Sequence, residues 1–410
     1  MKYNTATLPN GLRVIHLPSA SPVIYCGYQI AAGTRDELPG EEGLAHFCEH
    51  VTFKGTERRN ALQVINALEK VGGELNAFTN KEDTTFYAAI HRDHFRLAAD
   101  LLSDIVFHSQ YPQAEIDKEI EVICDEIESY NDSPAELIYD EFENILFEGH
   151  PLGHNILGQA DQLRTYTTED ARRFTRRHYR PNNAVFFAYG NLDFKKILAT
   201  IKGITAPIPS NPSSPSSPIT PITPITPSNP TIIRHKSTHQ AHVMIGCRAY
   251  AIKHPRRIAL YLLNNLLGGP GMNSRLNLSL RERHGLVYTV DSSMVSYGDT
   301  GLWAVYFGCD PADVTKCRRL VRHELDRLME KPLSLAQLNS AKQQIKGQIA
   351  IACDNREQFA LDFGKNFLHT GKEKYLDKLF SDIDAVTATD IQQVASKLFV
   401  PDNLTTLIYQ

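Results

Sequence analysis

A proline-rich segment divides the chain and constrains its fold more than any other feature of the sequence. Nine of the 24 residues from Pro207 to Pro230 are proline, and from Pro209 onward proline recurs at every third position. This spacing matches the three residues per turn of a polyproline II helix, and the segment lacks the apolar content of a core. We predict a linker over residues 207–231 between domains at 1–206 and 232–410. A docking peptide for a proline-binding partner is the alternative.

The two parts resemble distant copies of one unit. Each opens with a β-rich stretch, and each ends with a strand-like segment, NAVFFAY at Asn183–Tyr189 and NLTTLIY at Asn403–Tyr409. Helical patterns alternate irregularly with short strand patterns in both parts. This alternation favours an α+β fold over a doubly wound parallel sheet.

Composition excludes several classes of protein. The net charge of −4 gives no basic field for nucleic acid, and no apolar run approaches the ~18–20 residues of a membrane span. The opening MKYNTATLPNGL lacks the apolar core of a signal peptide. Seven cysteines without a CxxC pair indicate a reducing compartment. We therefore expect a cytoplasmic protein that binds neither nucleic acid nor membrane.

The strongest motif is H-x-x-E-H at positions 46–50. On a helix over 43–54, one apolar stripe is formed by Leu44, Phe47, Cys48 and Val51. His46, Glu49 and His50 fall on the opposite side, where two imidazoles at i and i+4 can converge on one metal ion. Glu49 can reach water at that metal without being a ligand. The alternative is a chance cluster of solvated polar residues.

A catalytic zinc site needs a third protein ligand and an open position. The segment Glu115–Ser129 has an isoleucine stripe at helical spacing, with Glu119 and Glu126 two turns apart on one flank. One of them could bind the metal while the other orients a ligand. The residues alone do not decide between them, and an ordinary acidic solvated face is also possible. Cys48 and Cys124 are interpreted as core residues, with a redox role as the alternative.

The order of several motifs resembles the pitrilysin family of zinc peptidases, in the branch of mitochondrial processing peptidase and related bacterial proteins. The motifs are LPNGLRV at 8–14, GLAHFCEHVTFKGT at 43–56, GGELNAFTNKEDTTFY at 72–87, the helix EIEVICDEIESYNDSP, HPLGHNILG at 150–158 and LLGGPGMNSRLNLSLRERHGLVYTV at 266–290. The resemblance covers nearly the whole chain. It implies two homologous repeats, each a mostly antiparallel sheet packed against helices.

The resemblance also implies roles at the metal site. It assigns His46, His50 and Glu126 as zinc ligands, Glu49 as general base and Glu119 as a supporting carboxylate. Tyr261–Leu267 corresponds loosely to the metal helix but has no H-x-x-E-H, so we expect one Zn²⁺ per chain. Other histidines, such as His150 and His154, have no metal-ligand spacing and are interpreted as loop or core residues.

Substrate-binding residues follow from the same resemblance. Arg281 and Tyr288, on either side of Gly285, match a pair that holds the substrate, and Tyr288 could donate to the oxyanion. A strand carrying Asn76, Ala77 and Thr79 matches an edge to which an extended peptide adds.

The family's known assemblies imply how the chain acts. Longer relatives have four repeats that close as a clam-shell, and two copies of this chain would supply four. We therefore expect a homodimeric zinc endopeptidase for peptides or unfolded segments, with Arg281 and Tyr288 of one protomer facing the zinc of the other. The alternative is a non-catalytic or hetero-partnered structural subunit of the same family.

Overall fold

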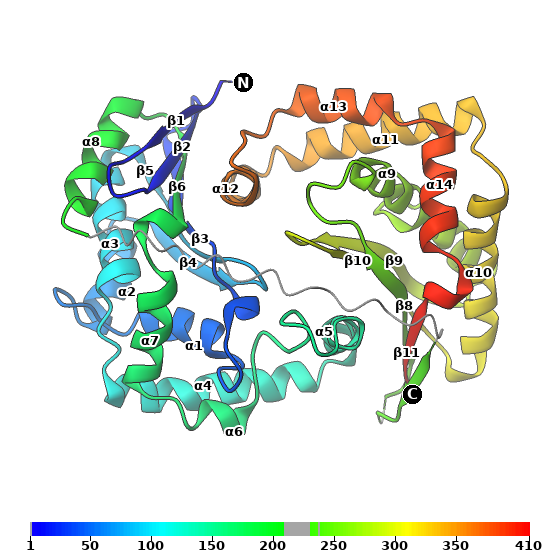
Figure 1. Ribbon diagram of the computed structural model, residues 1–410, viewed down its shortest axis with the longest axis horizontal. Coiled ribbons are helices and arrows are strands. Elements are labelled where there is room, and N and C mark those ends of the chain that lie inside the picture. The colour runs from blue at the N-terminus through cyan, green and yellow to red at the C-terminus, as the bar shows by residue number, and fades with distance from the viewer. Residues whose placement is uncertain (1, 209–229, 237) are drawn as a thin grey trace. The chain divides into compact units, whose positions relative to one another are not determined.

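Two β-sheets with matching strand order organise the protein (Figure 1). The computed structural model describes residues 2–208, 230–236 and 238–410, so most of the proline-rich segment lies outside the described residues. The first unit contains the described residues of Met1–Glu128, His154–Ile219 and Ala352–Tyr375. The second contains those of Ser129–Gly153, Thr220–Ile351 and Leu376–Gln410.

The first unit has a six-stranded sheet with the order β1-β2-β6-β3-β5-β4. Its strands are β1 (Asn4–Thr7), β2 (Arg13–Pro18), β3 (Val23–Ile30), β4 (Glu74–Thr79), β5 (Thr84–His91) and β6 (Ala184–Gly190). Only β2 and β6 pair in parallel; the other described pairs in this sheet are antiparallel. Strand β4 is therefore an edge strand.

The second unit has a five-stranded sheet with the order β7-β11-β8-β10-β9. Its strands are β7 (Thr231–Arg234), β8 (Ala241–Ala249), β9 (Val287–Ser296), β10 (Gly301–Cys309) and β11 (Thr405–Tyr409). The one parallel pair described in it, β7 with β11, corresponds to β2 with β6. Gly27 and Gly246 mark equivalent points on β3 and β8, because a Cβ on either would lie 2.2 Å from a carbonyl oxygen of the next strand.

Helices cover both faces of each sheet. In the first unit they are η1 (Thr34–Asp36), α1 (Leu44–Thr52), α2 (Ala61–Glu69), η2 (Arg92–His94), α3 (Phe95–His108), α4 (Gln113–Asn131), α6 (Ala160–Leu163), α7 (Thr168–His178), η3 (Pro181–Asn183), α8 (Phe194–Thr205) and α12 (Arg356–Thr370). In the second they are α5 (Pro134–Leu146), α9 (Arg257–Gly268), η4 (Asn277–Glu282), η5 (Pro311–Asp313), α10 (Val314–Glu330), α11 (Leu335–Ala352), α13 (Leu376–Ala385), α14 (Ala388–Leu398) and η6 (Pro401–Asn403).

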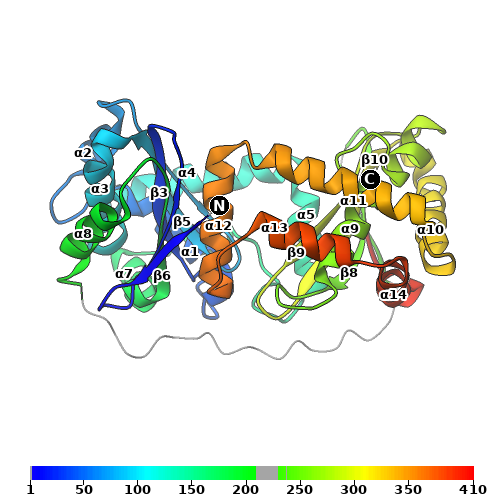
Figure 2. The same cartoon turned by 90° about the horizontal axis from the view of Figure 1, so that it is seen from above.

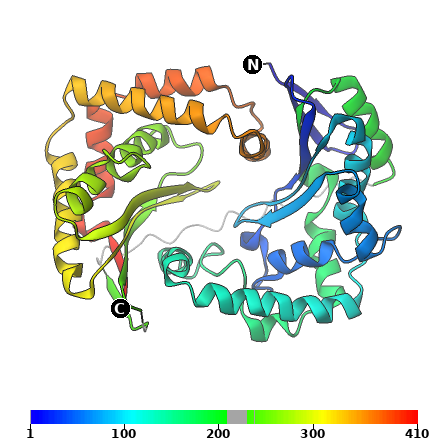
Figure 3. The ribbon, with the colours of Figure 1, turned by 180° about the vertical axis from the view of Figure 1, so that it is seen from behind.

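Each unit includes one helix from the other half of the chain. Helix α12 packs on β3 and β6 in the first unit, where the Gln29 side-chain amide donates a 2.9 Å hydrogen bond to the Leu361 carbonyl (Figure 2). Helix α5 packs on β8 and β11 in the second, where the Arg248 guanidinium donates a 2.7 Å bond to the Leu146 carbonyl (Figure 3). The exchange is thus reciprocal.

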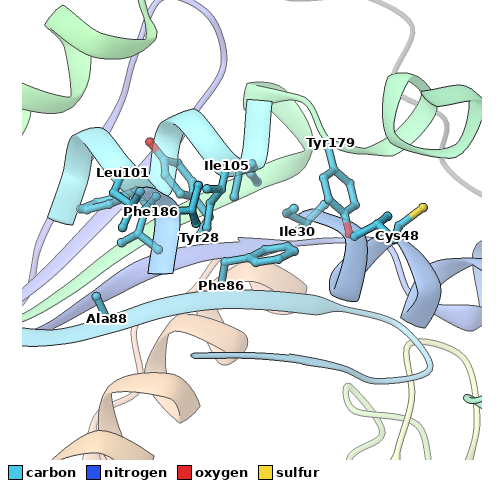
Figure 4. Close-up of a cluster of buried hydrophobic side chains, with 14 of the residues drawn as sticks. Tyr28, Ile30, Cys48, Phe86, Ala88, Leu101, Ile105, Tyr179 and Phe186 are labelled. Carbon is cyan, nitrogen blue, oxygen red and sulfur yellow. The ribbon is translucent and has the colours of Figure 1, made fainter. Parts of the chain in front are cut away.

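Period-two alternation on the strands builds the core of the first unit. Tyr28 and Phe186 point to the face covered by α3, and their rings pack edge to face with centroids 5.1 Å apart (Figure 4). Phe187 points to the opposite face and packs against Phe363 of α12.

The predicted α+β class with two repeats of mostly antiparallel sheet is confirmed. The domain boundaries at 206 and 232 stay a prediction. Boundaries of this kind divide the chain into continuous stretches, and so they cannot describe the exchange of α5 and α12 between the two units. Among the helices described, none has the length and apolar character needed to cross a membrane.

Candidate metal centre

Helix α1 carries the H-x-x-E-H motif and begins one residue inside the predicted range. Its apolar side is fully buried in the core of the first unit and consists of Leu44, Phe47, Cys48 and Val51. Figure 4 shows Cys48 beside Tyr179 at one end of this core. Cys124 of α4 is buried in the same core. The interpretation of both cysteines as packing residues is confirmed.

The predicted ligands converge where α1 lies beside α4 (Figures 1 and 3). Oε2 of Glu126 lies 3.9 Å from Nε2 of His46 and 3.5 Å from Nε2 of His50. One ligand atom from each of the three residues falls within 4.8 Å of the others. No other group of three such side chains is found in the part of the chain that the structure describes.

This group fits a zinc ion. Two imidazole nitrogens and one carboxylate oxygen are ordinary zinc ligands, and a tetrahedral ion with bonds of about 2.1 Å places its ligands about 3.4 Å apart. The separations of 3.5 and 3.9 Å are close to this value. Burial and the neighbouring His50 lower the pKa of His46 to about 3, so its ring is neutral and has a lone pair for a metal. Three protein ligands leave one position for water or substrate.

Glu119 contacts the second histidine rather than the centre of the group. Its Oε1 lies 3.0 Å from Nδ1 of His50, and its Oε2 lies 2.5 Å from Nζ of Lys54. Although burial acts to raise the pKa of Glu119, the bonds from His50 and Lys54 hold it below its usual range. The charged carboxylate fixes the His50 ring with Nε2 toward Glu126. This geometry favours Glu126 as the third ligand.

Glu49 lies on α1 between the two histidines in sequence and is buried. Its Oε2 accepts a 2.5 Å hydrogen bond from the hydroxyl of Thr79. Burial raises the pKa of Glu49, while the Thr79 bond acts in the opposite direction. A carboxylate with a raised pKa is suited to accept and release a proton near neutral pH.

The strand predicted to bind substrate is β4, at the edge of the first sheet. Asn76 is exposed, Ala77 is half-buried and Thr79 is buried. An edge strand presents unpaired backbone groups to which a peptide can add. The side chain of Thr79 is hydrogen-bonded to Glu49, so we assign it to the support of Glu49 rather than to substrate binding.

Arg281 and Tyr288 belong to the second unit, on η4 and on the edge strand β9. The guanidinium carbon of Arg281 lies 5.6 Å from the centroid of the Tyr288 ring, which is 81% exposed. Gly285 turns the chain between them with φ +59°, a conformation that favours glycine. The pair is therefore preformed. Its role toward a metal in the first unit stays a prediction.

Sequence reasoning missed two contacts of this site. Lys54 follows His50 by four residues, a spacing that could have indicated its contact with the same carboxylate. The bond between Thr79 and Glu49 had no such signal, because the residues are 30 positions apart on different elements.

Comparison with known proteins identifies similar sequences along most of the chain. Residues 14–160 match the family model "Insulinase (Peptidase family M16)", and residues 165–345 match "Peptidase M16 inactive domain". An uncharacterized zinc protease of Streptomyces coelicolor is 34% identical, with 95% of this chain and 85% of the relative covered. The uncharacterized zinc protease YmxG of Bacillus subtilis is 31% identical, with 98% and 97% covered.

Solved structures share the fold. A protease from Helicobacter pylori superposes with a TM-score of 0.92 at 22% identity, covering 100% of this chain and 99% of that one. A structure described as the peptidase M16 inactive domain from Pseudomonas fluorescens gives a TM-score of 0.90 at 18% identity, covering 100% and 98%. At these identities the likeness concerns the fold alone.

Proposed function

Because the chain belongs to peptidase family M16, we propose that it is a zinc-dependent endopeptidase that hydrolyses peptides or unfolded protein segments. The observation that carries this proposal is the convergence of His46, His50 and Glu126, with Glu49 on the same helix as both histidines. One Zn²⁺ per chain would be held by these three residues. This group has no counterpart in the described part of the second unit, where α9 takes the place of α1.

Each residue of the candidate site would have a separate role in hydrolysis. When bound, zinc supplies a Lewis acid that polarises a carbonyl and acidifies water. Glu49 takes a proton from the attacking water and returns it to the leaving amine. Thr79 holds the carboxylate of Glu49 in place, and Glu119 holds the ring of His50.

Substrate would bind in an extended form. The open edge of β4, with Asn76 and Ala77, offers backbone hydrogen bonds to a peptide, which makes recognition largely independent of side chains. Arg281 and Tyr288 would hold a peptide carbonyl, with Tyr288 as an oxyanion donor. In a homodimer this pair would come from the partner protomer, because two copies supply the four repeats of longer relatives.

A non-catalytic subunit is the competing function, since one matching family model and one structural neighbour are described as an inactive domain. That model matches residues 165–345, which exclude all three candidate ligands and Glu49. The proposed ligands and base all lie within residues 14–160, which match the model of the peptidase family itself. The proposal of catalysis therefore rests on residues outside that range.

The deciding experiment measures zinc content and cleavage of a generic quenched peptide by the purified chain. We expect one zinc per chain and cleavage that a chelator abolishes and added zinc restores. Glu49→Gln should retain zinc and lose cleavage by at least about 10²-fold. Zinc-loaded wild-type protein that cleaves no member of a diverse peptide mixture, or Glu49→Gln protein that cleaves normally, would rule out the proposed chemistry.

A further inference from the structure

The first turn of α1 is held by a side chain that lies outside the helix. The N-cap residue, Gly43, has no side chain that could accept from the free N–H groups of a helix start. Glu37 takes this role with both carboxylate oxygens. Its Oε2 accepts from the Gly43 N–H at 3.0 Å, and its Oε1 accepts from the Ala45 N–H at 2.7 Å. A carboxylate at this end of a helix is also stabilised by the helix dipole.

His154 holds the same carboxylate from a second segment. Its Nε2 lies 2.8 Å from Oε2 of Glu37, whose side chain is only 1% exposed. The backbone carbonyl of His154 accepts a hydrogen bond from the buried ammonium of Lys81. Because these groups are shielded from water, each bond is stronger and its loss is more costly.

Backbone packing fixes the same two segments against each other. A Cβ on Gly43 would lie 2.8 Å from Cα of Gly158, and both glycines have positive φ, +88° and +71°. The hydroxyl of Tyr166 donates a 3.0 Å hydrogen bond to the Glu42 carbonyl. The start of α1 therefore has one well-defined position against the segment 154–158.

The position of this turn sets the position of the metal ligands. Ala45, whose N–H is bound by Glu37, directly precedes His46, and His50 follows one turn later on the same rigid helix. The chain leaves the first unit after Glu128, two residues beyond Glu126, and re-enters it at His154. The segment 129–153 is therefore preceded by Glu126 of the candidate metal site and followed by His154, which contacts Glu37.

We infer that Glu37 and His154 are positioning residues for the metal centre: Glu37 anchors the first turn of α1, and His154 holds Glu37, so that His46 and His50 face Glu126. This inference rests on the proposed function only for the identity of the metal. It predicts an effect on zinc affinity as well as on turnover.

The test compares Glu37→Gln with Glu42→Gln. Glu37→Gln keeps the size of the side chain but places an N–H₂ donor opposite groups that are themselves donors. The side chain of Glu42, by contrast, accepts one described bond, which is exposed, from the Gly40 N–H at 3.1 Å. Zinc affinity is measured by competition with a chromophoric chelator, and folding by circular dichroism and thermal unfolding. We expect Glu37→Gln to bind zinc about 10- to 100-fold more weakly and Glu42→Gln to match the wild type.

A second pair of variants keeps Glu37 in place. His154→Leu removes the donor to Oε2, and His154→Gln can restore one with its amide. We expect zinc affinity to fall in the leucine variant and to recover in part in the glutamine variant. Unchanged affinity in Glu37→Gln and His154→Leu, or an equal loss in Glu42→Gln, overturns the inference. If Glu37→Gln does not fold, the His154 pair decides alone. Zinc-binding wild-type protein without peptidase activity would refute the proposed function while leaving this comparison decisive.

Discussion

The Thr79 hydroxyl donates a 2.5 Å hydrogen bond to Oε2 of Glu49 and so joins the edge strand β4 to helix α1. Thr79 is the last residue of β4, and its side chain is buried. A peptide that adds to β4 would therefore lie along the same strand that holds the proposed base. This relationship gives Thr79 a positioning role in addition to the strand role expected from the sequence.

Removing the Thr79 hydroxyl should impair Glu49 as the proposed base without lowering the zinc content. In Thr79→Val the volume is retained but the donor is lost, so the orientation of Glu49 is no longer fixed. We expect kcat to fall about tenfold or more while zinc content stays at the wild-type level. Thr79→Ser, which keeps the hydroxyl, is the matched control and should retain most activity. Equal kcat in the valine and serine variants would contradict the role.

Glu119 should control zinc affinity through His50. Glu119→Gln removes the negative charge that faces Nδ1 of His50 and Nζ of Lys54. We expect zinc to bind about 10- to 100-fold more weakly in a chelator competition. Glu115→Gln, on the same helix and paired with Lys118, is the control and should bind zinc normally. A normal affinity in Glu119→Gln would mean that Lys54 and His50 do not depend on this carboxylate.

Tyr288 should contribute to turnover and not to metal binding. Its ring is exposed and stacked on Arg281, so Tyr288→Phe keeps the stacking and removes only the hydroxyl. We expect kcat to fall by about 10²-fold, as for the loss of an oxyanion donor, with zinc content unchanged. Tyr375→Phe, which removes a hydroxyl bound to Glu373, should have no effect on either quantity. Loss of zinc in Tyr288→Phe would contradict the assignment.

An ion pair between Asp83 and α12 should make stability depend on acidic pH. Oδ2 of Asp83 lies 2.8 Å from Nζ of Lys365 and 3.1 Å from Nε2 of His369. Burial acts to raise the pKa of Asp83, but these partners hold it at about 2, below the usual 3.8. The folded state thus binds the proton less tightly than the unfolded state. The stabilisation is complete above about pH 4 and is lost as the pH falls toward 2.

Asp83→Asn should therefore lower the free energy of unfolding by about 2 kcal/mol at neutral pH. The difference from the wild type should shrink between pH 4 and pH 2, as followed by urea unfolding. Asp93→Asn, at an exposed ion pair, should change stability by less than about 0.5 kcal/mol at any pH. A difference for Asp83→Asn that does not vary with pH would exclude the ion pair as its cause.

Complementation tests the proposed homodimer. Glu49→Gln protomers lack the base, and Arg281→Ala protomers lack the substrate arginine, so each variant alone should be nearly inactive. If each site combines Glu49 of one protomer with Arg281 of the other, mixing the variants should restore one intact site per mixed dimer. We expect up to about a quarter of wild-type activity after subunit exchange. Confirmed mixed dimers without recovered activity would place both residues in one chain.

Local patterns in the sequence were sufficient to predict the two helices that carry the candidate metal ligands. The stripe from Leu44 to Val51 and the isoleucines of α4 have helical periodicity, and both segments are helices in the structure. The choice between Glu119 and Glu126 could not be made from periodicity, because both lie on one flank of α4. The family resemblance assigned Glu126, and the distances to His46 and His50, which depend on how α4 packs against α1, support that choice.

Contacts between distant segments could not be predicted in the same way. Glu37 meets His154 across 117 positions, and Asp83 meets His369 across 286. Neither pair has a spacing that marks it, because the geometry is produced by the tertiary fold. The exchange of helices α5 and α12 could not be predicted for a related reason. The apolar face of a helix shows that it packs on a sheet, but not which of two similar sheets it packs on.

The exchange of α5 and α12 has a consequence for biosynthesis. A ribosome has made the H-x-x-E-H motif, both glutamates of α4 and all six strands of the first sheet by the time it reaches Gly190. The face of that sheet beneath α12 still stays bare until Arg356–Thr370 emerges. The first unit therefore stays incomplete while residues 191–355 are synthesised, and α12 completes it only near the end of translation.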